Sequence, residues 1–272
     1  MRTALVTGAS SGIGKETVLK LLERGCVVYA AARRVDRMAD LADRGAVVLG
    51  MDITRDEDIV AVVDRITADR GGVDVLVNNA GFGLYGAIED TTADDARHQF
   101  EVNLFGPARL TRSVLPYMRK RGSGRIVNVS SVGGRMYTPL GGWYHATKYA
   151  LEGWSDCLRL ELAPFGIDVV VVEPGLIETE FGDVMVEPLL ARSGSSAYAG
   201  MARWVADATR LNYEPGKGSP ASVPAEVIVR ALAARRPRTR YVAGKYARTL
   251  ITLRGLLSDR AFDHVVTGAA RS

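Results

Sequence analysis

The sequence has 272 residues, of which 47% are hydrophobic, and this is enough for a substantial buried core, so an intrinsically disordered chain is excluded. No apolar run approaches the roughly 18 residues of a membrane-spanning helix, and the first residues lead directly into a strand-like segment. We therefore expect no transmembrane segment, no signal peptide and a cytoplasmic location. The two cysteines, Cys26 and Cys157, are too few and too far apart for a disulfide framework or a zinc site, and no acidic cluster suggests another metal.

Short apolar runs alternate along the chain with segments of helical periodicity. Strands are expected at residues 3–7, 26–32, 46–51, 73–77, 125–129, 167–172 and 240–243, and helices at 12–24, 35–44, 56–69, 92–121 and 142–164. The strand segments are continuously apolar rather than alternating, which is typical of strands covered on both faces of a parallel sheet. The sequence therefore predicts an α/β fold, a single-domain doubly wound parallel sheet of about seven strands with helices on both faces.

The turn after the first expected strand contains glycines in the pattern G-x-x-x-G-x-G. Glycine allows a tight turn and a close approach to a pyrophosphate, whose charge then lies at the amides of the helix N-terminus. A plain tight loop is the alternative, but the position directly after the first strand favours dinucleotide binding. The residues expected to take part are Gly8, Ser10, Ser11, Gly12, Ile13 and Gly14.

The end of the second expected strand bears on the choice between NAD and NADP. A protein that binds NAD commonly places a carboxylate there for the ribose hydroxyls, and one that binds NADP places a cation for the 2′-phosphate. Here the strand is followed by Arg33 and Arg34, and the first carboxylate is Asp36. This favours NADP(H). Two alternatives stay open: the arginines form a solvated helix entry, or Asp36 reaches back to the ribose of NAD(H).

Tyr144 and Lys148 are four residues apart in a segment of helical periodicity, so their side chains share one helix face. A lysine ammonium beside a phenol favours the phenolate and moves the tyrosine pKa from about 10 toward neutrality, where a general acid or base is most effective. The pair alone has an ordinary alternative, a half-buried ring beside a solvated amine.

Further motifs follow one another at compatible spacings over about residues 3–180. With the glycine turn they are Thr7-Gly8-Ala9-Ser10-Ser11-Gly12-Ile13-Gly14, Asp52-Ile53-Thr54, Asn78-Asn79-Ala80-Gly81, Asn103, Ser131, Tyr144 with Lys148, and Pro174-Gly175 with Thr179. In this order the chain resembles the short-chain dehydrogenase/reductase family. The family places its serine thirteen residues before the tyrosine, which selects Ser131 rather than Ser130.

The resemblance implies a role for each catalytic candidate. Tyr144 would protonate a carbonyl oxygen during reduction, or take the alcohol proton during oxidation, while hydride moves between substrate and nicotinamide. Lys148 would hold the nicotinamide ribose and lower the tyrosine pKa, and Ser131 would donate a hydrogen bond to the substrate oxygen. Asn103 would bind a water that connects Lys148 to solvent. From the residues alone, a loop-capping hydroxyl and a helix kink or cap are the alternatives for Ser131 and Asn103.

The resemblance also implies the remaining cofactor contacts. They are Asp52 and Ile53 beside the adenine, Asn79, Ala80 and Gly81 over its ribose, and Pro174, Gly175, Ile177 and Thr179 after the sixth strand. In the last group, the Ile177 backbone and the Thr179 hydroxyl would hold the carboxamide and fix the nicotinamide face.

Three parts of one domain, residues 1–272, follow from these patterns. Residues 1–180 are expected to be the cofactor-binding and catalytic core. Over residues 181–223 the periodicity breaks down into glycine, serine, proline and scattered apolar residues, which predicts a long irregular lid over the substrate. Residues 224–272 add a strand and helices.

The apolar content of the lid predicts a bulky apolar carbonyl or alcohol as substrate. Phe181 and Tyr213 belong to this segment, and Phe82, Leu140 and Trp143 are expected nearby. An oligomer contact or simple packing is the alternative.

The C-terminal part contains the excess that gives the chain its net charge of +4, since eight Lys and Arg and no acid lie between residues 227 and 258. We expect a solvated basic face over a core-packed helix, and the alternative is contact with an anionic membrane surface or an acidic carrier. Without interleaved aromatics or a recognition motif, a nucleic-acid partner is not expected. This ending resembles the extended family members that include the 17β-hydroxysteroid and retinol dehydrogenases.

The sequence thus predicts an NADP(H)-dependent oxidoreductase of an apolar ketone or aldehyde, or of a secondary alcohol, steroid-, retinoid- or otherwise lipid-like, with NAD(H) as the alternative cofactor. Family habit implies a homodimer or homotetramer. The alternative function is a non-catalytic NAD(P)-sensing protein on the same fold, against which the intact Ser131, Tyr144 and Lys148 speak. No role is expected for the histidines, and His145 is expected to point away from the tyrosine face.

Overall fold

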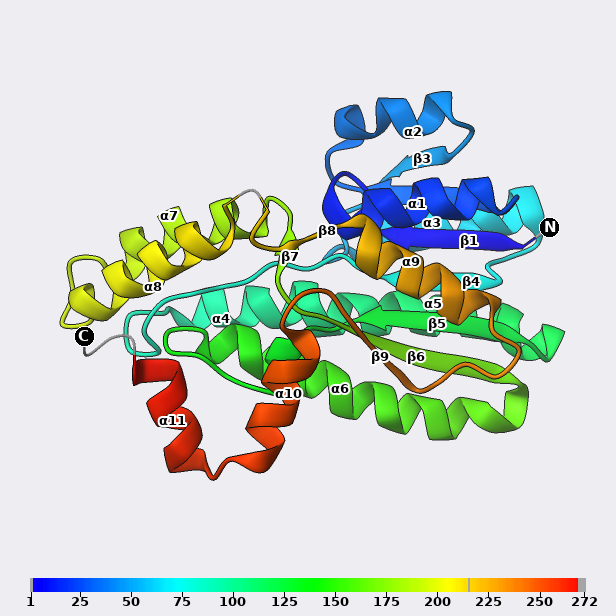
Figure 1. Ribbon diagram of the computed structural model, residues 1–272. Helices are drawn as coiled ribbons and strands as arrows, with labels where there is room; N and C mark the ends of the chain where they lie inside the picture. Colours follow the sequence, from blue (N-terminus) through cyan, green and yellow to red (C-terminus); the bar gives the residue numbers. More distant parts are fainter. Residues whose placement is uncertain (1, 215, 269–272) are drawn as a thin grey trace.

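The computed structural model describes residues 2–214 and 216–268 (Figure 1). Residue 1, residue 215 in the expected lid and residues 269–272 of the expected C-terminal part lie outside the described residues. A parallel sheet of seven strands runs through the domain in the order β3-β2-β1-β4-β5-β6-β9. Its strands are β1 (Thr3–Thr7), β2 (Val27–Ala32), β3 (Val47–Gly50), β4 (Val75–Asn78), β5 (Gly124–Val129), β6 (Ile167–Pro174) and β9 (Arg240–Ala243).

Helices cover both faces of this sheet (Figure 1). They are α1 (Gly12–Glu23), α2 (Ala39–Asp43), α3 (Asp56–Arg70), α4 (Ala93–Phe100), α5 (Gly106–Arg121), α6 (Gly142–Leu162), α7 (Phe181–Ser193), α8 (Ala199–Asn212), α9 (Ser222–Ala233), α10 (Ala247–Leu256) and α11 (Asp259–Thr267). Alternate residues of a strand serve opposite layers: Ala4 and Val6 belong to the core that includes α1 and α9, and Leu5 to the core that includes α3, α5 and α6. The predicted doubly wound α/β sheet is confirmed.

The strand order changes direction between β1 and β4, since β2 and β3 extend the sheet on one side and β5, β6 and β9 on the other. In open α/β sheets, ligands bind in the crevice beyond the carboxyl ends of the strands at such a switch point. The segments that follow β1 and β4 are the predicted glycine turn and residues 79–81, so the fold places both at this crevice.

The prediction of an irregular lid over residues 181–223 is wrong in its secondary structure. The segment forms α7 and α8, which lie side by side and share a small core of their own, and α9 begins at its end (Figure 1). The short strands β7 (Ile177–Glu178) and β8 (Ser219–Pro220) pair at its base. Hydrophobic periodicity did not predict these two helices for two reasons. Pro188 lies inside α7, and Val184 and Met201, at 57% and 40% exposure, do not belong to a single buried stripe.

Two predicted helices are subdivided. The segment expected at 35–44 opens with a 3-10 turn, Val35–Met38, before α2. The segment expected at 92–121 consists of α4 and α5 joined by a π-helical turn, Glu101–Phe105. An inserted residue of this kind interrupts the helical ladder and is frequent at functional sites.

The C-terminal helix was expected to pack against the core, but only part of its apolar face is buried. In α10, Ala247 is buried, whereas Leu250, Ile251 and Leu253 are half-buried and Leu256 is 79% exposed. The helix is amphipathic in sequence, but it packs at the periphery and buries little of its apolar face. None of the helices within residues 2–214 and 216–268 combines the length and apolarity that a membrane crossing requires.

Candidate active site

The turn between β1 and α1 has the backbone that its glycines predict. Gly8 and Gly12 have φ values of 64° and 53°, in the left-handed region that favours glycine. A Cβ on Gly14 would lie 2.3 Å from the Gly8 carbonyl oxygen and 2.5 Å from Asn79 Nδ2, so this position has no room for a side chain. Helix α1 begins with no side-chain cap and no acid in its first turn, which leaves its N-terminal amides able to bind an anion.

Gly14→Ala is expected to lower the free energy of unfolding by at least about 1 kcal/mol and to weaken dinucleotide binding, because the added methyl group displaces the turn. Thermal unfolding and a cofactor titration measure the two effects. Gly153→Ala is the matched control, since Gly153 is exposed on α6 and a Cβ there meets nothing within 4 Å. Equal behaviour of the two variants would contradict a tightly closed turn.

The carboxyl end of β4 is tied to this turn. Thr7 Oγ1 accepts hydrogen bonds from the backbone amides of Asn79 (3.0 Å) and Ala80 (2.9 Å). Asn79 Nδ2 donates to the carbonyl oxygens of Thr7 (2.9 Å) and Gly8 (3.2 Å). These bonds hold the segment from Asn79 to Gly81 beside the glycine turn.

Arg33 and Arg34 are exposed directly after β2. Arg34 Nη2 lies 3.4 Å from Ser10 Oγ and 3.4 Å from Glu180 Oε2. Within residues 2–214 and 216–268, the Arg33 side chain makes no hydrogen bond or ion pair, so its guanidinium is available to an anion. Asp36 is exposed at the start of the following 3-10 turn.

Asp52 and Ile53 follow β3. Asp52 Oδ1 accepts hydrogen bonds from Thr54 N (2.9 Å) and Thr54 Oγ1 (2.8 Å). Burial acts to raise the pKa of Asp52, but the Thr54 hydrogen bonds and the charge of Arg33 outweigh it and hold the pKa below its ordinary value. The carboxylate is therefore ionised and fixed, and Ile53 is buried beside it.

Tyr144 and Lys148 are both buried on one face of α6, at 7% exposure each. Lys148 Nζ donates a hydrogen bond to the carbonyl oxygen of Val129 (2.9 Å), the last residue of β5. The Tyr144 ring contacts Tyr85, with ring centroids 5.9 Å apart, and Phe181, at 5.6 Å. The alternative of a solvated amine is therefore wrong: the lysine is enclosed beside the tyrosine.

Burial dominates the ionisation of this pair. Desolvation raises the pKa of Tyr144 well above its ordinary value, while a hydrogen bond with Ser131 acts in the opposite direction. Desolvation also lowers the pKa of Lys148 to about 8, against the charge of Glu152, which raises it. The expected lowering of the tyrosine pKa is thus reversed in the protein structure, because burial and the neighbouring phenol of Tyr85 both raise it.

Ser131 lies two residues after β5 and caps a short 3-10 turn, Val132–Gly134. Its Oγ accepts a hydrogen bond from Gly133 N (3.0 Å). A Cβ on Gly133 would lie 3.1 Å from Tyr144 Cε1, which shows how closely this turn approaches the tyrosine. The loop-capping alternative and the proximity to Tyr144 therefore both hold, since the serine proton stays free to donate.

Asn103 is buried in the π-helical turn between α4 and α5. Its Oδ1 accepts from Phe82 N (3.1 Å), and its Nδ2 donates to Phe82 O (3.0 Å) and Thr147 Oγ1 (3.1 Å). A Cβ on Gly81 would lie 3.2 Å from Asn103 Oδ1 and 3.8 Å from Lys148 Nζ, so the amide lies close to the lysine. This π-helical turn agrees with the alternative given for Asn103 from the sequence, a helix kink.

The segment after β6 returns to the glycine turn. A Cβ on Gly12 would lie 3.0 Å from Thr179 Cγ2, so the two segments are in contact. Thr179 Oγ1 accepts a hydrogen bond from Phe181 N (3.3 Å), which links it to the start of α7. Ile177 is buried in β7.

One cavity of about 520 Å³ joins these segments. Most of the predicted site residues line it: Gly8, Ser10, Ser11, Gly12, Ile13, Arg33, Arg34, Asp52, Ile53, Asn79, Ala80, Gly81, Ser131, Tyr144, Lys148, Pro174, Gly175, Ile177 and Thr179. Gly14 and Asn103 are absent from its wall. Gly14 shapes the turn from behind, and Asn103 is covered by its contacts with Phe82 and Thr147.

Several wall residues were not predicted as part of the site. Tyr85 and Leu250 line the cavity, whereas Leu140 and Trp143, expected near the substrate, do not. Leu140 packs against the α7–α8 core, and the Trp143 ring lies 6.4 Å from that of Phe100. No sequence signal marks Tyr85, because its place at the site depends on the path of the loop after β4.

His145, for which no role was expected, also lines the cavity and is buried at 6% exposure. Its Nδ1 lies 2.9 Å from Gly133 O, and its Nε2 accepts from Thr138 N at 3.0 Å. Burial lowers the pKa of His145, so the neutral ring ties the Ser131 loop to α6. The expectation that it points away from the tyrosine is wrong, since the two ring centroids are 5.6 Å apart.

The cavity suits a nicotinamide dinucleotide. Its volume falls within the roughly 300–1,000 Å³ of ligand sites. It joins the glycine turn, an arginine that has no protein partner among the described residues, and a buried phenol. The turn can hold a pyrophosphate, the arginines an additional phosphate, and Tyr144 with Lys148 the reacting end.

Comparison with known proteins identifies the class. A model of the family described as short chain dehydrogenase matches residues 2–188. Human 17-beta-hydroxysteroid dehydrogenase type 1 is 33% identical over 282 residues, which cover 98% of this chain and 84% of that protein. The 3-ketodihydrosphingosine reductase of Bacteroides thetaiotaomicron is 43% identical over 180 residues, 66% of this chain and 65% of the reductase. The chain belongs to the short-chain dehydrogenase/reductase family.

It is accordingly an NAD(P)-dependent oxidoreductase that acts on CH-OH groups, which favours the enzyme over the non-catalytic sensor. A short-chain dehydrogenase from Streptomyces avermitilis superposes with a TM-score of 0.82, at 35% identity over 99% of this chain and 97% of that one. A variant of actinorhodin polyketide ketoreductase with NADPH gives 0.73, at 31% identity over 89% and 95%. A family member from Burkholderia phymatum with NAD gives 0.80, at 25% identity over 94% and 92%.

Proposed function

We propose that this protein is an NADP(H)-dependent reductase of bulky apolar ketones or aldehydes, which in reverse oxidises the secondary alcohol, and that Tyr144 is its acid and base. The observation that carries the proposal is the enclosure of Tyr144 and Lys148 beside Ser131, in the same cavity that Arg33 and the glycine turn line. Residues 1–180 form the catalytic core, residues 181–223 cover the substrate, and residues 224–272 complete the sheet edge.

The chemistry follows from the state of each side chain. Bound NADP(H) would supply or accept the hydride at its nicotinamide ring. Burial keeps the Tyr144 phenol protonated at neutral pH, so it can give its proton to a carbonyl oxygen that is becoming an alcohol. Ser131 is positioned to donate a hydrogen bond to the same oxygen, since it accepts from Gly133 N and its own proton stays free. The Lys148 ammonium stabilises the phenolate that remains, and Asn103 supports the proton relay from behind the lysine.

Arg33 supports the choice of NADP(H). Its guanidinium lines the cavity without a protein partner among the described residues, whereas Asp36, the carboxylate that would favour NAD(H), is exposed and does not line the cavity. Asp52, Ile53 and the segment 79–81 hold the adenosine, and Pro174, Gly175, Ile177 and Thr179 hold the carboxamide.

An apolar substrate is supported by aromatic and aliphatic side chains in the cavity wall. Tyr85, Phe181, Tyr213 and Leu250 line the cavity. Tyr85 and Phe181 contact the Tyr144 ring, and Tyr213 stacks on Phe181. Two relatives are named for 3-ketodihydrosphingosine and a 17-beta-hydroxysteroid, both compatible with a bulky apolar substrate.

Titration of the purified protein with NADPH and NADH, followed by nicotinamide fluorescence, tests the cofactor without knowledge of the substrate. Markedly tighter binding of NADPH is expected, followed by turnover of a panel of hydrophobic ketones with it. Tighter binding of NADH would contradict the assignment of Arg33, and binding of neither would contradict the proposed function.

We propose further that the enzyme is a cytoplasmic homodimer or homotetramer. Phe105, at the end of the π-helical turn before α5, and Tyr149 and Leu160, on α6, are exposed at 47%, 44% and 69%, and their burial would favour association. Light scattering coupled to size exclusion measures the assembly, and cell fractionation measures the location.

A further inference from the structure

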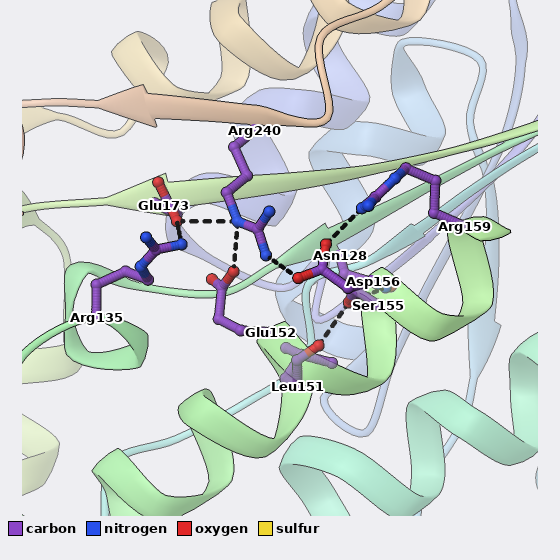
Figure 2. Close-up of polar contacts among 9 residues, drawn as sticks. All are labelled: Asn128, Arg135, Leu151, Glu152, Ser155, Asp156, Arg159, Glu173 and Arg240. Atoms are coloured by element: carbon purple, nitrogen blue, oxygen red, sulfur yellow. Dashed lines mark hydrogen bonds and ion pairs between the residues drawn. The ribbon is translucent and has the colours of Figure 1, made fainter.

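Six charged side chains form a network between α6, the helix that carries Tyr144 and Lys148, and the neighbouring strands β6 and β9 (Figure 2). Arg240, the first residue of β9, lies at its centre. Its Nε is 3.0 Å from Glu152 Oε2 and 3.5 Å from Glu173 Oε1, and its Nη2 is 2.6 Å from Asp156 Oδ2. Arg135 Nη1 is 3.7 Å from Glu173 Oε1, and Arg159 pairs with Asp156.

The network joins the segments that carry Ser131, Tyr144 and Lys148 to the strand that leads into the cofactor segment. Glu152 and Asp156 lie on α6, and Glu152 is four residues after Lys148. Arg135 belongs to the loop that begins at Ser131, and Glu173 lies at the end of β6, directly before the Pro174-Gly175 cofactor segment. Arg240 adds the edge strand and pairs with both α6 and β6, and Glu173 extends the network to the Ser131 loop through Arg135.

Burying the charged groups of this network costs desolvation free energy. Glu152 and Glu173 are 5% and 2% exposed, and Glu152 Oε1 has no hydrogen-bond partner among the described residues. Burial, then the neighbouring charge of Glu152, raises the pKa of Glu173. Buried ion pairs often contribute little net stability compared with apolar packing. The Glu152 charge also acts on a second buried group.

That effect falls on Lys148. The lysine ammonium is buried, and its one hydrogen bond in the described residues is to a neutral carbonyl, Val129 O. Residues four apart on a helix are neighbours, and the Glu152 charge acts to raise the pKa of Lys148, against desolvation. The titratable and charged groups on the elements around the lysine are Tyr144, Glu152 and Asp156 on α6, Glu173 on β6, Arg135 on the loop after β5 and Arg240 on β9.

We infer that Glu152, held in place by Arg240, is a positioning residue that keeps Lys148 in its ammonium form. This inference rests on the proposed function for the importance of the ammonium, but the charge state of Lys148 can be measured without any reaction. Arg240 fixes the carboxylate from the edge strand, and the same arginine connects α6 to Glu173, directly before the cofactor segment.

Glu152→Gln tests the inference, because the amide keeps the size of the side chain and an acceptor for Arg240 while it removes the charge. Without the carboxylate, the ammonium loses a favourable interaction, so the pKa of Lys148 is expected to fall from about 8 by about one pH unit. The readout is an NMR pH titration of the lysine side chains in the cofactor-free protein, with the Lys148 signal assigned by its loss in Lys148→Arg.

Two variants complete the design. Glu161→Gln makes the same chemical change at an exposed position of the same helix and should leave the Lys148 midpoint unchanged. Glu152→Asp keeps the charge and should retain most of the wild-type midpoint. Wild-type and Glu152→Gln midpoints that coincide, or equal falls in Glu152→Gln and Glu152→Asp, would overturn the inference.

The pH profile of carbonyl reduction gives a second readout. Activity that needs the ammonium is lost as pH rises through the Lys148 pKa, so in Glu152→Gln the descending limb of kcat/KM should move about one pH unit toward acid. A descending limb that stays in place would overturn the inference. If the wild type bound neither cofactor, the proposed function would fail while the NMR result still decided the role of Glu152.

Discussion

Tyr144→Phe is expected to bind NADPH as tightly as the wild type yet to lose about 10²–10⁴ of kcat/KM, the range typical for removal of a general acid or base. Phenylalanine keeps the ring in contact with Tyr85 and Phe181, so the cavity wall is preserved. The hydroxyl that gives its proton to the substrate oxygen is lost, and Ser131 cannot replace it because a serine hydroxyl is a much weaker acid. Steady-state kinetics and the NADPH titration measure the two quantities separately.

Tyr149→Phe is the matched control for this change. Tyr149 lies on the same helix but is 44% exposed and does not line the cavity, so its activity should stay within about twofold of the wild type. Retention of turnover in Tyr144→Phe would remove the tyrosine from the mechanism. Loss of NADPH affinity together with turnover would instead assign it to binding.

Arg33→Ala is expected to weaken NADPH binding about 10–100-fold, which corresponds to the loss of one or two charge-assisted contacts to a phosphate. NADH has no 2′-phosphate, so its affinity should change little. Because the Arg33 side chain makes no ion pair with the described part of the protein, its removal should leave the thermal midpoint unchanged. Parallel titrations with the two cofactors give the ratio of affinities.

Arg37→Ala provides the comparison. Arg37 belongs to the same surface but pairs with Glu180 at 2.8 Å and does not line the cavity. Its replacement should leave the NADPH preference in place. Equal losses for NADPH and NADH in Arg33→Ala would mean that the arginine has a structural role rather than one in recognising the phosphate.

Patterns over a few neighbouring residues were enough to predict the strands, the glycine turn and the shared helix face of Tyr144 and Lys148. The strands are continuous apolar runs, and β1 could be placed from residues 3–7 alone. The glycine turn could be identified because Gly8, Gly12 and Gly14 each answer a backbone requirement: two adopt positive φ, and the third has no room for a Cβ. Tyr144 and Lys148 share a face because of helical spacing, which needs no tertiary information.

Other features depend on contacts between distant segments. Arg240 and Glu152 are 88 residues apart, so their pairing could not be recognised before β9 was placed next to β6. Tyr85 enters the site through the course of a loop, and the direction of the Tyr144 pKa is set by burial that the sequence does not show. The helices α7 and α8 could not be predicted from the sequence because their apolar residues pack on each other and do not form a stripe that faces the sheet.

The separate core of α7 and α8 has an evolutionary consequence. Val186, Leu189, Ala202, Val205 and Ala206 form it without drawing on the two layers that cover the sheet. Substitutions on this helical pair can therefore accumulate with little effect on the stability of the dinucleotide-binding frame. Because α7 contributes Phe181 and Val184 to the cavity wall, such substitutions are expected to alter the shape of the cavity while the two cores that pack on the sheet stay intact.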